Sequence, residues 1–195
     1  EPSRKPIEVL ETLRFSPNEG FTRLALHLDR VQRSAGAFSI PFDASRARTA
    51  LSNCVADFRS ELRVRLALSE EGELACAASE LPPKKEPFWR FAISESRVSS
   101  QNALLHHKTS WRGFYDTALD SYPNCDEVVF LNEHGRLTEG CRTNLFIRRG
   151  GRLVTPREKD GLLPGCLRRE LIDKGLCEES EIYLDDLRTA NDLFL

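Results

Sequence analysis

The chain has 195 residues, a formal net charge of -2 and a pI of about 6.2. A chain of this length can bury a substantial core, as one domain or as two small ones. The near balance of charges gives no reason to expect nucleic acid or an anionic membrane as a partner. No apolar run approaches a membrane span and no leader pattern precedes Ile7, so we expect a soluble cytoplasmic protein.

The cysteines are scattered, without any C-x-x-C pair, at positions 54, 76, 125, 141, 166 and 177. This pattern is typical of free thiols in a reducing compartment, not of a disulfide framework or a zinc site. We therefore expect no metal site.

The first eighty residues have the pattern of a small α/β domain. Residues 7–15 (IEVLETLRF) alternate imperfectly and predict a strand, which ends at a turn cluster. Helical spacing of apolar residues predicts a helix over 24–38, and Asp43 is placed to cap a second helix. Two alternating segments, 61–69 and 73–79, then predict a β-hairpin.

The first predicted helix carries a second stripe, which is polar: Arg23, His27, Arg30 and Ser34. Such a stripe could hold a phosphate, because arginine presents a planar fork of donors. On the pattern alone, a solvated polar face is the simpler interpretation.

The proline-rich, charged segment 82–87 (PPKKEP) is the best candidate for a domain boundary. We expect a small domain over 1–81, a linker over 82–87 and a larger domain over 88–195. The larger domain should start with a strand at 88–95. Because the strand-like run 192–195 ends without a turn, we also expect the sequence to stop before the fold does.

Lys108 lies between an apolar run and a predicted helix that carries Trp111, Phe114 and Tyr115 and is capped by Thr109 or Ser110. A single lysine is usually solvated. At this place its ammonium would be partly desolvated, which favours the reactive neutral amine.

His106-His107 could suggest a metal ligand or a base, but no third ligand follows at helical or hairpin spacing. Local packing or a substrate contact is the better interpretation. Cys141 and Cys166 could suggest a Cys/His hydrolase, but no pattern orients a base toward either thiol. We interpret both as small residues that line a pocket.

Residues 127–169 alternate short apolar runs with turn signals, which predicts consecutive strands of one sheet. Glu139 is predicted in a turn between two of them. Pro164-Gly165 starts a helix that stops at Gly175 and leaves backbone N–H groups at its start, a ready anion site. Residues 181–184 predict a further strand, followed by a short helix capped by Asp185.

These motifs together resemble the fold-type IV pyridoxal-phosphate (PLP) enzymes, which include branched-chain and D-amino-acid aminotransferases and 4-amino-4-deoxychorismate lyase. The series is Thr138-Glu139-Gly140, Asn144-Leu145-Phe146, Thr155-Pro156, Gly161-Leu162-Leu163-Pro164-Gly165 and Arg168, with His27-x-x-Arg30 and Lys108 upstream. The segments ETLR, LHLDRV, HKTSWR and GLLPGCLRREL most resemble the lyase branch, including the lyase module of fused p-aminobenzoate synthase. The resemblance covers nearly the whole chain.

The resemblance implies an α+β, two-domain fold: a small N-terminal α/β domain and a larger C-terminal β-rich domain with helices, with PLP between them. It also implies a homodimer. Lys108 would be the Schiff-base lysine and Glu139 would face the pyridine nitrogen. Arg30 and the amides of Gly165, Cys166 and Leu167 would hold the phosphate, while His27 either shares that role or packs.

Two positions depart from the aminotransferase pattern. Trp111-Arg112 stands where that branch more often has Asn-Tyr, so the partner of the ring hydroxyl is open between Arg112 and Tyr115. Leu167 stands where some members have threonine. His107 and Cys141 are further candidates for substrate or ring contacts.

The implied reaction is elimination of pyruvate from aminodeoxychorismate to give p-aminobenzoate, a precursor of folate. Two alternatives remain open from the sequence. One is transamination of a branched-chain or D-amino acid with the same lysine and glutamate. The other is a homologue that has kept the fold and lost the cofactor.

Overall fold

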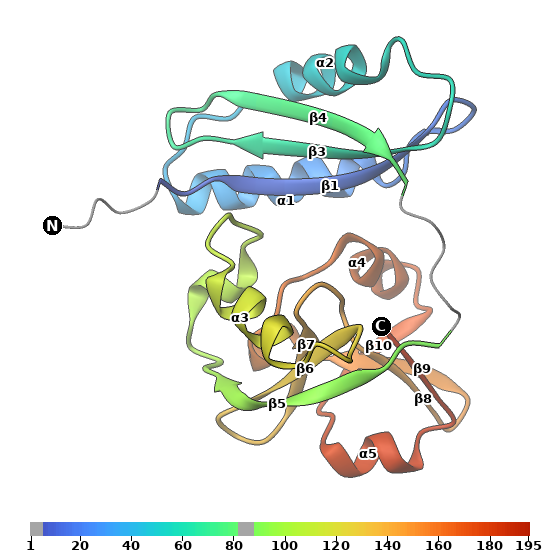
Figure 1. Ribbon diagram of the computed structural model, residues 1–195. Coiled ribbons are helices and arrows are strands. Elements are labelled where there is room, and N and C mark those ends of the chain that lie inside the picture. The colour runs from blue at the N-terminus through green and yellow to red at the C-terminus, as the bar shows by residue number, and fades with distance from the viewer. Residues whose placement is uncertain (1–5, 82–87) are drawn as a thin grey trace, which may run out of the picture. The chain divides into compact units, whose positions relative to one another are not determined.

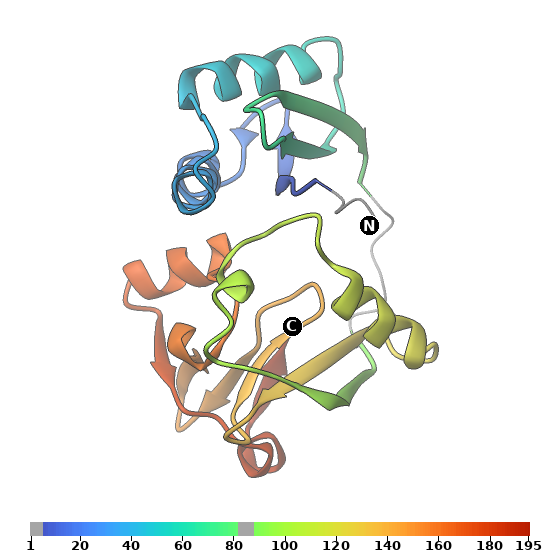
Figure 2. The same ribbon diagram turned by 90° about the vertical axis from the view of Figure 1, so that its left-hand side faces the viewer.

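The computed structural model describes residues 6–81 and 88–195 (Figures 1 and 2). These residues form two compact units, one within Glu1–Lys85 and Lys108–Trp111, the other within Glu86–His107 and Arg112–Leu195. The short lysine segment thus belongs to the first unit, although in the sequence it lies between two stretches of the second unit. The linker expected at 82–87 lies outside the described residues. Sheets and helices occur in both units, which confirms the predicted mixed α and β class.

The first unit is built on a four-stranded antiparallel sheet of order β2-β1-β3-β4. Its strands are β1 (Val9–Ser16), β2 (Gly20–Phe21), β3 (Leu62–Leu68) and β4 (Leu74–Glu80). The hairpin predicted from the two alternating segments is confirmed, with Leu66 opposite Cys76. Alternation explains the burial of β3, because Leu62, Val64 and Leu66 point into the core while the intervening arginines are exposed.

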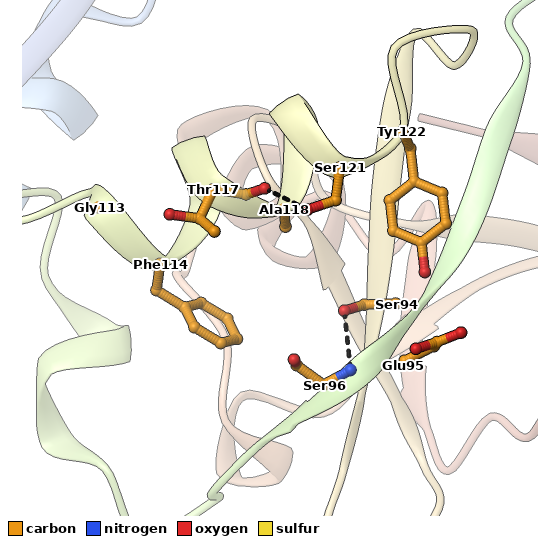
Figure 3. A pocket seen from close by; sticks show the side chains of 9 residues that line it. All are labelled: Ser94, Glu95, Ser96, Gly113, Phe114, Thr117, Ala118, Ser121 and Tyr122. Atoms are coloured by element: carbon orange, nitrogen blue, oxygen red, sulfur yellow. Dashed lines mark hydrogen bonds between the residues drawn. The ribbon is translucent and has the colours of Figure 1, made fainter.

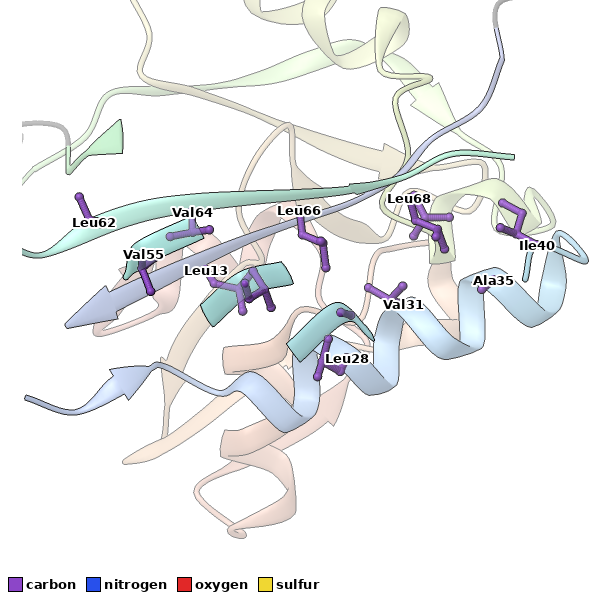
Figure 4. Close-up of a cluster of buried hydrophobic side chains, with 13 residues drawn as sticks. Leu13, Leu28, Val31, Ala35, Ile40, Val55, Leu62, Val64, Leu66 and Leu68 are labelled. Atoms are coloured by element: carbon purple, nitrogen blue, oxygen red, sulfur yellow. The ribbon is translucent and has the colours of Figure 1, made fainter. Parts of the chain in front are cut away.

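Helices α1 (Leu24–Ala37) and α2 (Ala44–Val55) pack on the core face of this sheet (Figures 1 and 4). The apolar stripe of α1 supplies Leu28, Val31 and Ala35. Burying each large aliphatic side chain contributes about 1.5–3 kcal/mol. Asp43 caps α2 as predicted, because its Oδ1 accepts a hydrogen bond from the Ser45 amide at 2.7 Å.

The second unit contains two sheets where the sequence predicted one for residues 127–169. One has the order β5-β6-β7, from β5 (Phe91–Val98), β6 (Glu127–Asn132) and β7 (Leu137–Gly140). The other has the order β10-β9-β8-β11, from β8 (Phe146–Arg149), β9 (Arg152–Pro156), β10 (Cys177–Ser180) and β11 (Asp192–Phe194). The division occurs after Gly140, where the chain turns out of the first sheet before β8 begins.

The helix after the lysine, α3 (Gly113–Ser121), starts later than predicted and is capped by neither Thr109 nor Ser110. Ser110 has another role, because its amide donates to the Glu8 carbonyl and its hydroxyl accepts from the Glu8 amide at 3.0 Å. The segment therefore stays extended beside β1, and helical hydrogen bonding begins only beyond it.

Helix α4 (Cys166–Asp173) confirms the helix predicted at Pro164-Gly165. The strand predicted at 181–184 is wrong, because β10 ends at Ser180 and pairs in parallel with β9. Asp185 lies inside α5 (Leu184–Thr189) and does not cap it; the N-cap is Tyr183, whose amide donates to Asp186 at 2.8 Å. Among the described residues, no helix combines the length and apolar character that a membrane crossing requires.

Candidate functional site

Glu139 lies on strand β7, not in the turn that the sequence predicted. The strand continues through this position because Thr138 donates its hydroxyl to the Phe130 carbonyl of β6 and Glu139 bridges to Asn144. The side chain of Glu139 is buried, with 6% exposure. A carboxylate so far from solvent needs hydrogen-bond donors, and the surrounding elements supply them.

The described residues that donate to the Glu139 carboxylate include Tyr115, Leu163 and Asn144. The Tyr115 hydroxyl donates to Oε1 at 2.9 Å, and the Leu163 amide donates to Oε2 at 3.0 Å. The side-chain amide of Asn144 lies 3.5 Å from Oε2. The sequence proposed Tyr115 and Glu139 as separate site residues, and the structure joins them directly.

Arg112 and Cys141 lie around the same tyrosine. The Arg112 guanidinium lies 5.1 Å from the centre of the Tyr115 ring and donates to the Cys141 carbonyl. The Cys141 thiol donates to the Tyr115 carbonyl at 3.4 Å. Burial, with the negative charge of Glu127, raises the pKa of this thiol to about 12. A thiol that stays protonated is a poor nucleophile, so Cys141 does not suit the hydrolase alternative.

The loop between β7 and β8 is held by a second buried carboxylate, Glu127. Its Oε2 accepts from the Arg142 amide at 3.1 Å and from the Thr143 hydroxyl at 2.9 Å. Gly140 makes this approach possible, since a Cβ there would lie 2.7 Å from the Glu127 Cδ. No role for Glu127 was predicted. Its signal in the sequence is a charged residue followed by the four apolar residues of β6.

The start of helix α4 is shaped by Gly165 and Asn144. Gly165 is the N-cap, and a Cβ on it would lie 2.0 Å from the Asn144 Oδ1. Asn144 also donates to the Leu163 carbonyl at 2.8 Å, which fixes the segment leading into the helix. Gly165 makes no side-chain cap of its own, and the first-turn amides with the positive end of the helix dipole favour an anion at this helix start. Cys166 is buried and Leu167 is exposed.

Arg168 from the same motif has a structural role. Its side chain is buried, pairs with Glu179 and donates to the Pro156 carbonyl at 2.9 Å. These contacts tie α4 to strands β9 and β10.

In the first unit, Arg30 and His27 meet on one carboxylate, that of Glu11. Nε and Nη2 of Arg30 donate to the two oxygens at 2.8 and 2.7 Å, and Nδ1 of His27 lies 2.6 Å from Oε2. Burial alone would raise the pKa of Glu11, but the hydrogen bonds and charges of His27 and Arg30 lower it. The helix pattern alone suggested that this polar stripe is solvated. That interpretation is wrong for Arg30 and Ser34, which are buried.

Sequence reasoning missed Glu11 as a site residue. Its signal was present, because Glu11 occupies an inward position of β1 between Val9 and Leu13, both of which belong to the core. An ionised residue at such a position requires a charged or hydrogen-bonding partner.

Lys108 is fixed by its backbone to the same strand. Its carbonyl accepts from the Leu10 amide at 2.8 Å, and Thr109 bridges to Val9 in antiparallel fashion. The lysine side chain is half-buried, as the sequence predicted. The neighbouring His107 ends the 3-10 helix Ala103–His106, where its amide donates to the Leu104 carbonyl.

An open hollow of about 330 Å³ lies on the second unit, between β5 and α3 (Figure 3). Its lining combines the aromatic residues Phe114 and Tyr122 with small hydroxyl residues, which are Ser94, Ser96, Thr117 and Ser121. None of the residues predicted to bind a cofactor lines it.

The fold and these motifs define the class of protein. The amino-transferase class IV family matches residues 8–195, so the chain belongs to this family. Its fold-type IV members, the aminotransferases and the aminodeoxychorismate lyases, depend on PLP and act on small-molecule amines. The chain is therefore a PLP-dependent enzyme of the lyase or the aminotransferase type.

Both types occur among the relatives. The chain is 30% identical over 96% of its length to a Thermotoga maritima protein named "Probable branched-chain-amino-acid aminotransferase", covering 72% of that protein. It is 24% identical over 97% of its length to the aminodeoxychorismate lyase of Bacillus subtilis, covering 73% of it. The crystal structure of a "Putative amino-acid aminotransferase" from Mesorhizobium loti is 39% identical, with a TM-score of 0.91 over 96% of this chain and 93% of that one.

The residues present fit PLP in each unit taken separately. The second unit offers a buried carboxylate at Glu139, suited to a protonated ring nitrogen, and a helix start at Gly165, suited to a phosphate. The first unit offers a half-buried lysine and an arginine whose fork is held in place by Glu11.

Proposed function

We propose that this chain is a 4-amino-4-deoxychorismate lyase that eliminates pyruvate from aminodeoxychorismate and releases p-aminobenzoate. The observation that carries the PLP chemistry is the buried Glu139 carboxylate, held by Tyr115 and by the Leu163 amide. The lyase assignment is supported by the HKTSWR and GLLPGCLRREL segments and by the similarity to the lyase of Bacillus subtilis.

Lys108 is the proposed catalytic residue. When bound, PLP supplies an electron sink for the carbon that carries the substrate amine. Lys108 would hold PLP through Nζ, and this nitrogen would become free once the substrate amine takes its place. Its freed Nζ would then take the proton from C4, while the ether C–O bond breaks and pyruvate leaves. The ring becomes aromatic in the same step, so the site needs orientation and one well-placed base.

The remaining roles follow from charge. Glu139 would face the pyridine nitrogen and favour its protonated form. The amides of Gly165, Cys166 and Leu167 would bind the phosphate at the start of α4, with Arg30 as a further donor. Because Glu11 already offsets the charge of Arg30, we propose that this arginine contributes directed hydrogen bonds more than net positive charge. His107, Arg112 and Cys141 remain candidates for substrate contacts.

The second candidate is transamination of a branched-chain or D-amino acid. The 30% identity to the Thermotoga maritima protein supports it. This reaction uses the same lysine and glutamate, and it needs in addition a site for the α-carboxylate of the substrate. Cytoplasmic location, homodimeric assembly and a place in folate synthesis stay predictions from the sequence.

The first experiment compares wild type with Lys108→Ala after incubation with PLP. Wild type should form a near-visible absorption band that borohydride reduces, and Lys108→Ala should not. Lys159→Ala is the matched control, because Lys159 is exposed and lies outside the motifs. A band that persists in Lys108→Ala would overturn the assignment of the lysine. If wild type forms no band, the homologue without cofactor becomes the better account.

The second experiment separates the two enzymes. With aminodeoxychorismate, a lyase should release pyruvate and p-aminobenzoate in equal amounts, and Lys108→Ala should release neither. With leucine or a D-amino acid, a transaminase should change the spectrum of bound PLP, and a keto acid should reverse the change. Reversal by a keto acid without pyruvate release from aminodeoxychorismate would replace our proposal by the second candidate.

A further inference from the structure

Glu139 takes its donors from separate parts of the second unit. Tyr115 belongs to α3, Asn144 to the loop before β8, and Leu163 to the segment before α4. The tyrosine donates to Oε1, while the other two are directed at Oε2. Removing the tyrosine hydroxyl would take a directed donor away from Oε1, so this contact helps to set the orientation of the carboxylate.

Tyr115 is itself held in place. Its ring lies edge-on to Phe130 at 5.6 Å and to Phe114 at 5.6 Å, and the Arg112 guanidinium covers it. Burial raises the pKa of Tyr115, and the negative charge of Glu139 and the hydrogen bond to it raise it further. The hydroxyl therefore remains protonated and acts as a permanent donor.

We propose that Tyr115 is the positioning residue of Glu139, which it orients and keeps ionised toward the pyridine nitrogen, and that it is not the partner of the ring hydroxyl. This inference rests on the proposed function, which gives Glu139 its role. A phenol has one O–H to donate, and that of Tyr115 is committed to Oε1. The tyrosine would thus act on the cofactor through the carboxylate.

The consequence concerns the proton shared by Glu139 and the ring nitrogen. A donor to a carboxylate stabilises its charged form, so the proton rests on the nitrogen. Without the Tyr115 hydroxyl, the neutral carboxyl becomes easier to form and the ring-protonated share of bound PLP falls. We therefore expect the loss of this charge-assisted hydrogen bond to weaken the binding of PLP about tenfold.

The test is a double-mutant cycle on PLP binding with Tyr115→Phe, Glu139→Gln and the double variant. Tyr115→Phe should bind PLP about tenfold more weakly and show a smaller ring-protonated band. In the Glu139→Gln background, the same change should have no further effect, because the carboxylate on which it acts is absent. Tyr122→Phe is the matched control, since its hydroxyl lies 3.5 Å from the Ile93 carbonyl and lines the hollow of Figure 3.

Two results would overturn the inference. One is a Tyr115→Phe variant that matches Tyr122→Phe in both affinity and spectrum. The other is an equal loss of affinity in the presence and the absence of Glu139, which would mean that Tyr115 acts only on packing. Both leave the proposed function intact if Glu139→Gln alone changes the spectrum. If Glu139→Gln binds PLP like wild type and shows an unchanged spectrum, Glu139 does not contact the pyridine nitrogen. That result would overturn both the proposed role of Glu139 and this inference.

Discussion

Glu11 binds both nitrogens of the Arg30 fork, Nε at 2.8 Å and Nη2 at 2.7 Å, in the core of the first unit. The pair joins β1 to α1 where apolar side chains surround it on both elements. Two ionised groups can remain in such a place only because each compensates the other. The proposed phosphate contact of Arg30 therefore depends on Glu11 for its orientation.

Glu11→Gln should destabilise the first unit by about 3 kcal/mol, because it leaves the buried Arg30 without a counter-charge. Chemical denaturation measures this loss. Asp29→Asn is the control, since it removes a half-exposed ion pair with Arg33 on the same helix and should cost no more than about 0.5 kcal/mol. Equal effects of the two substitutions would contradict the importance of the buried pair.

The same pair predicts a dependence on pH. The pKa of Glu11 is lowered from its ordinary value of 4.5, so the folded state holds the carboxylate ionised more strongly than the unfolded chain does. Its contribution to stability is present above pH 4.5 and is lost as the pH falls through the folded value. The difference in unfolding free energy between wild type and Glu11→Gln should narrow on acidification below 4.5. A difference that stays constant would show that the pair does not titrate in this way.

The sequence was sufficient to propose roles for Lys108, Glu139 and the Gly165 helix start, because each belongs to a short contiguous motif. It could not assign Glu11, whose partners His27 and Arg30 lie 16 and 19 residues further along the chain. Glu11 meets these partners only because α1 packs over the inward face of β1. The residues next to Glu11 in the sequence do not indicate which helix will pack there.

The same limit explains the wrong prediction of one sheet for residues 127–169. The strands themselves were predicted, since their apolar runs and turns are local signals. Their division into two sheets depends on Glu127, which holds Arg142 and Thr143 across 15 and 16 residues and directs the chain away from β7. Likewise, the hydroxyl of Tyr115 reaches Glu139 across 24 residues, so its role was left open.

Tyr115 predicts a second dependence on pH, at the alkaline end. Its pKa is raised above the ordinary value of 10.0, chiefly by burial and then by the charge of Glu139. The folded state keeps the proton that the unfolded chain releases, so stability is full below pH 10.0 and declines as the pH rises above it. Tyr115→Phe lacks this group and should lose less stability than wild type above pH 10.0, measured by denaturation on either side of that value. The same alkaline loss in both proteins would contradict the assignment.

Gly140 gives a prediction about the loop that carries Asn144. An alanine Cβ at this position would lie 2.7 Å from the Glu127 Cδ and 2.8 Å from the Thr143 Oγ1, with the carboxylate buried and unable to move away. Gly140→Ala should therefore destabilise the protein by about 1–3 kcal/mol and weaken PLP binding, because Asn144 and Glu139 would shift with the loop.

Gly36→Ala is the matched control. Gly36 lies within α1 with open space around it, so the same substitution there should stabilise the helix by up to about 1 kcal/mol. Denaturation and PLP titration of the two variants check this prediction. A Gly140→Ala protein as stable as wild type would show that Glu127 leaves room for a side chain at position 140.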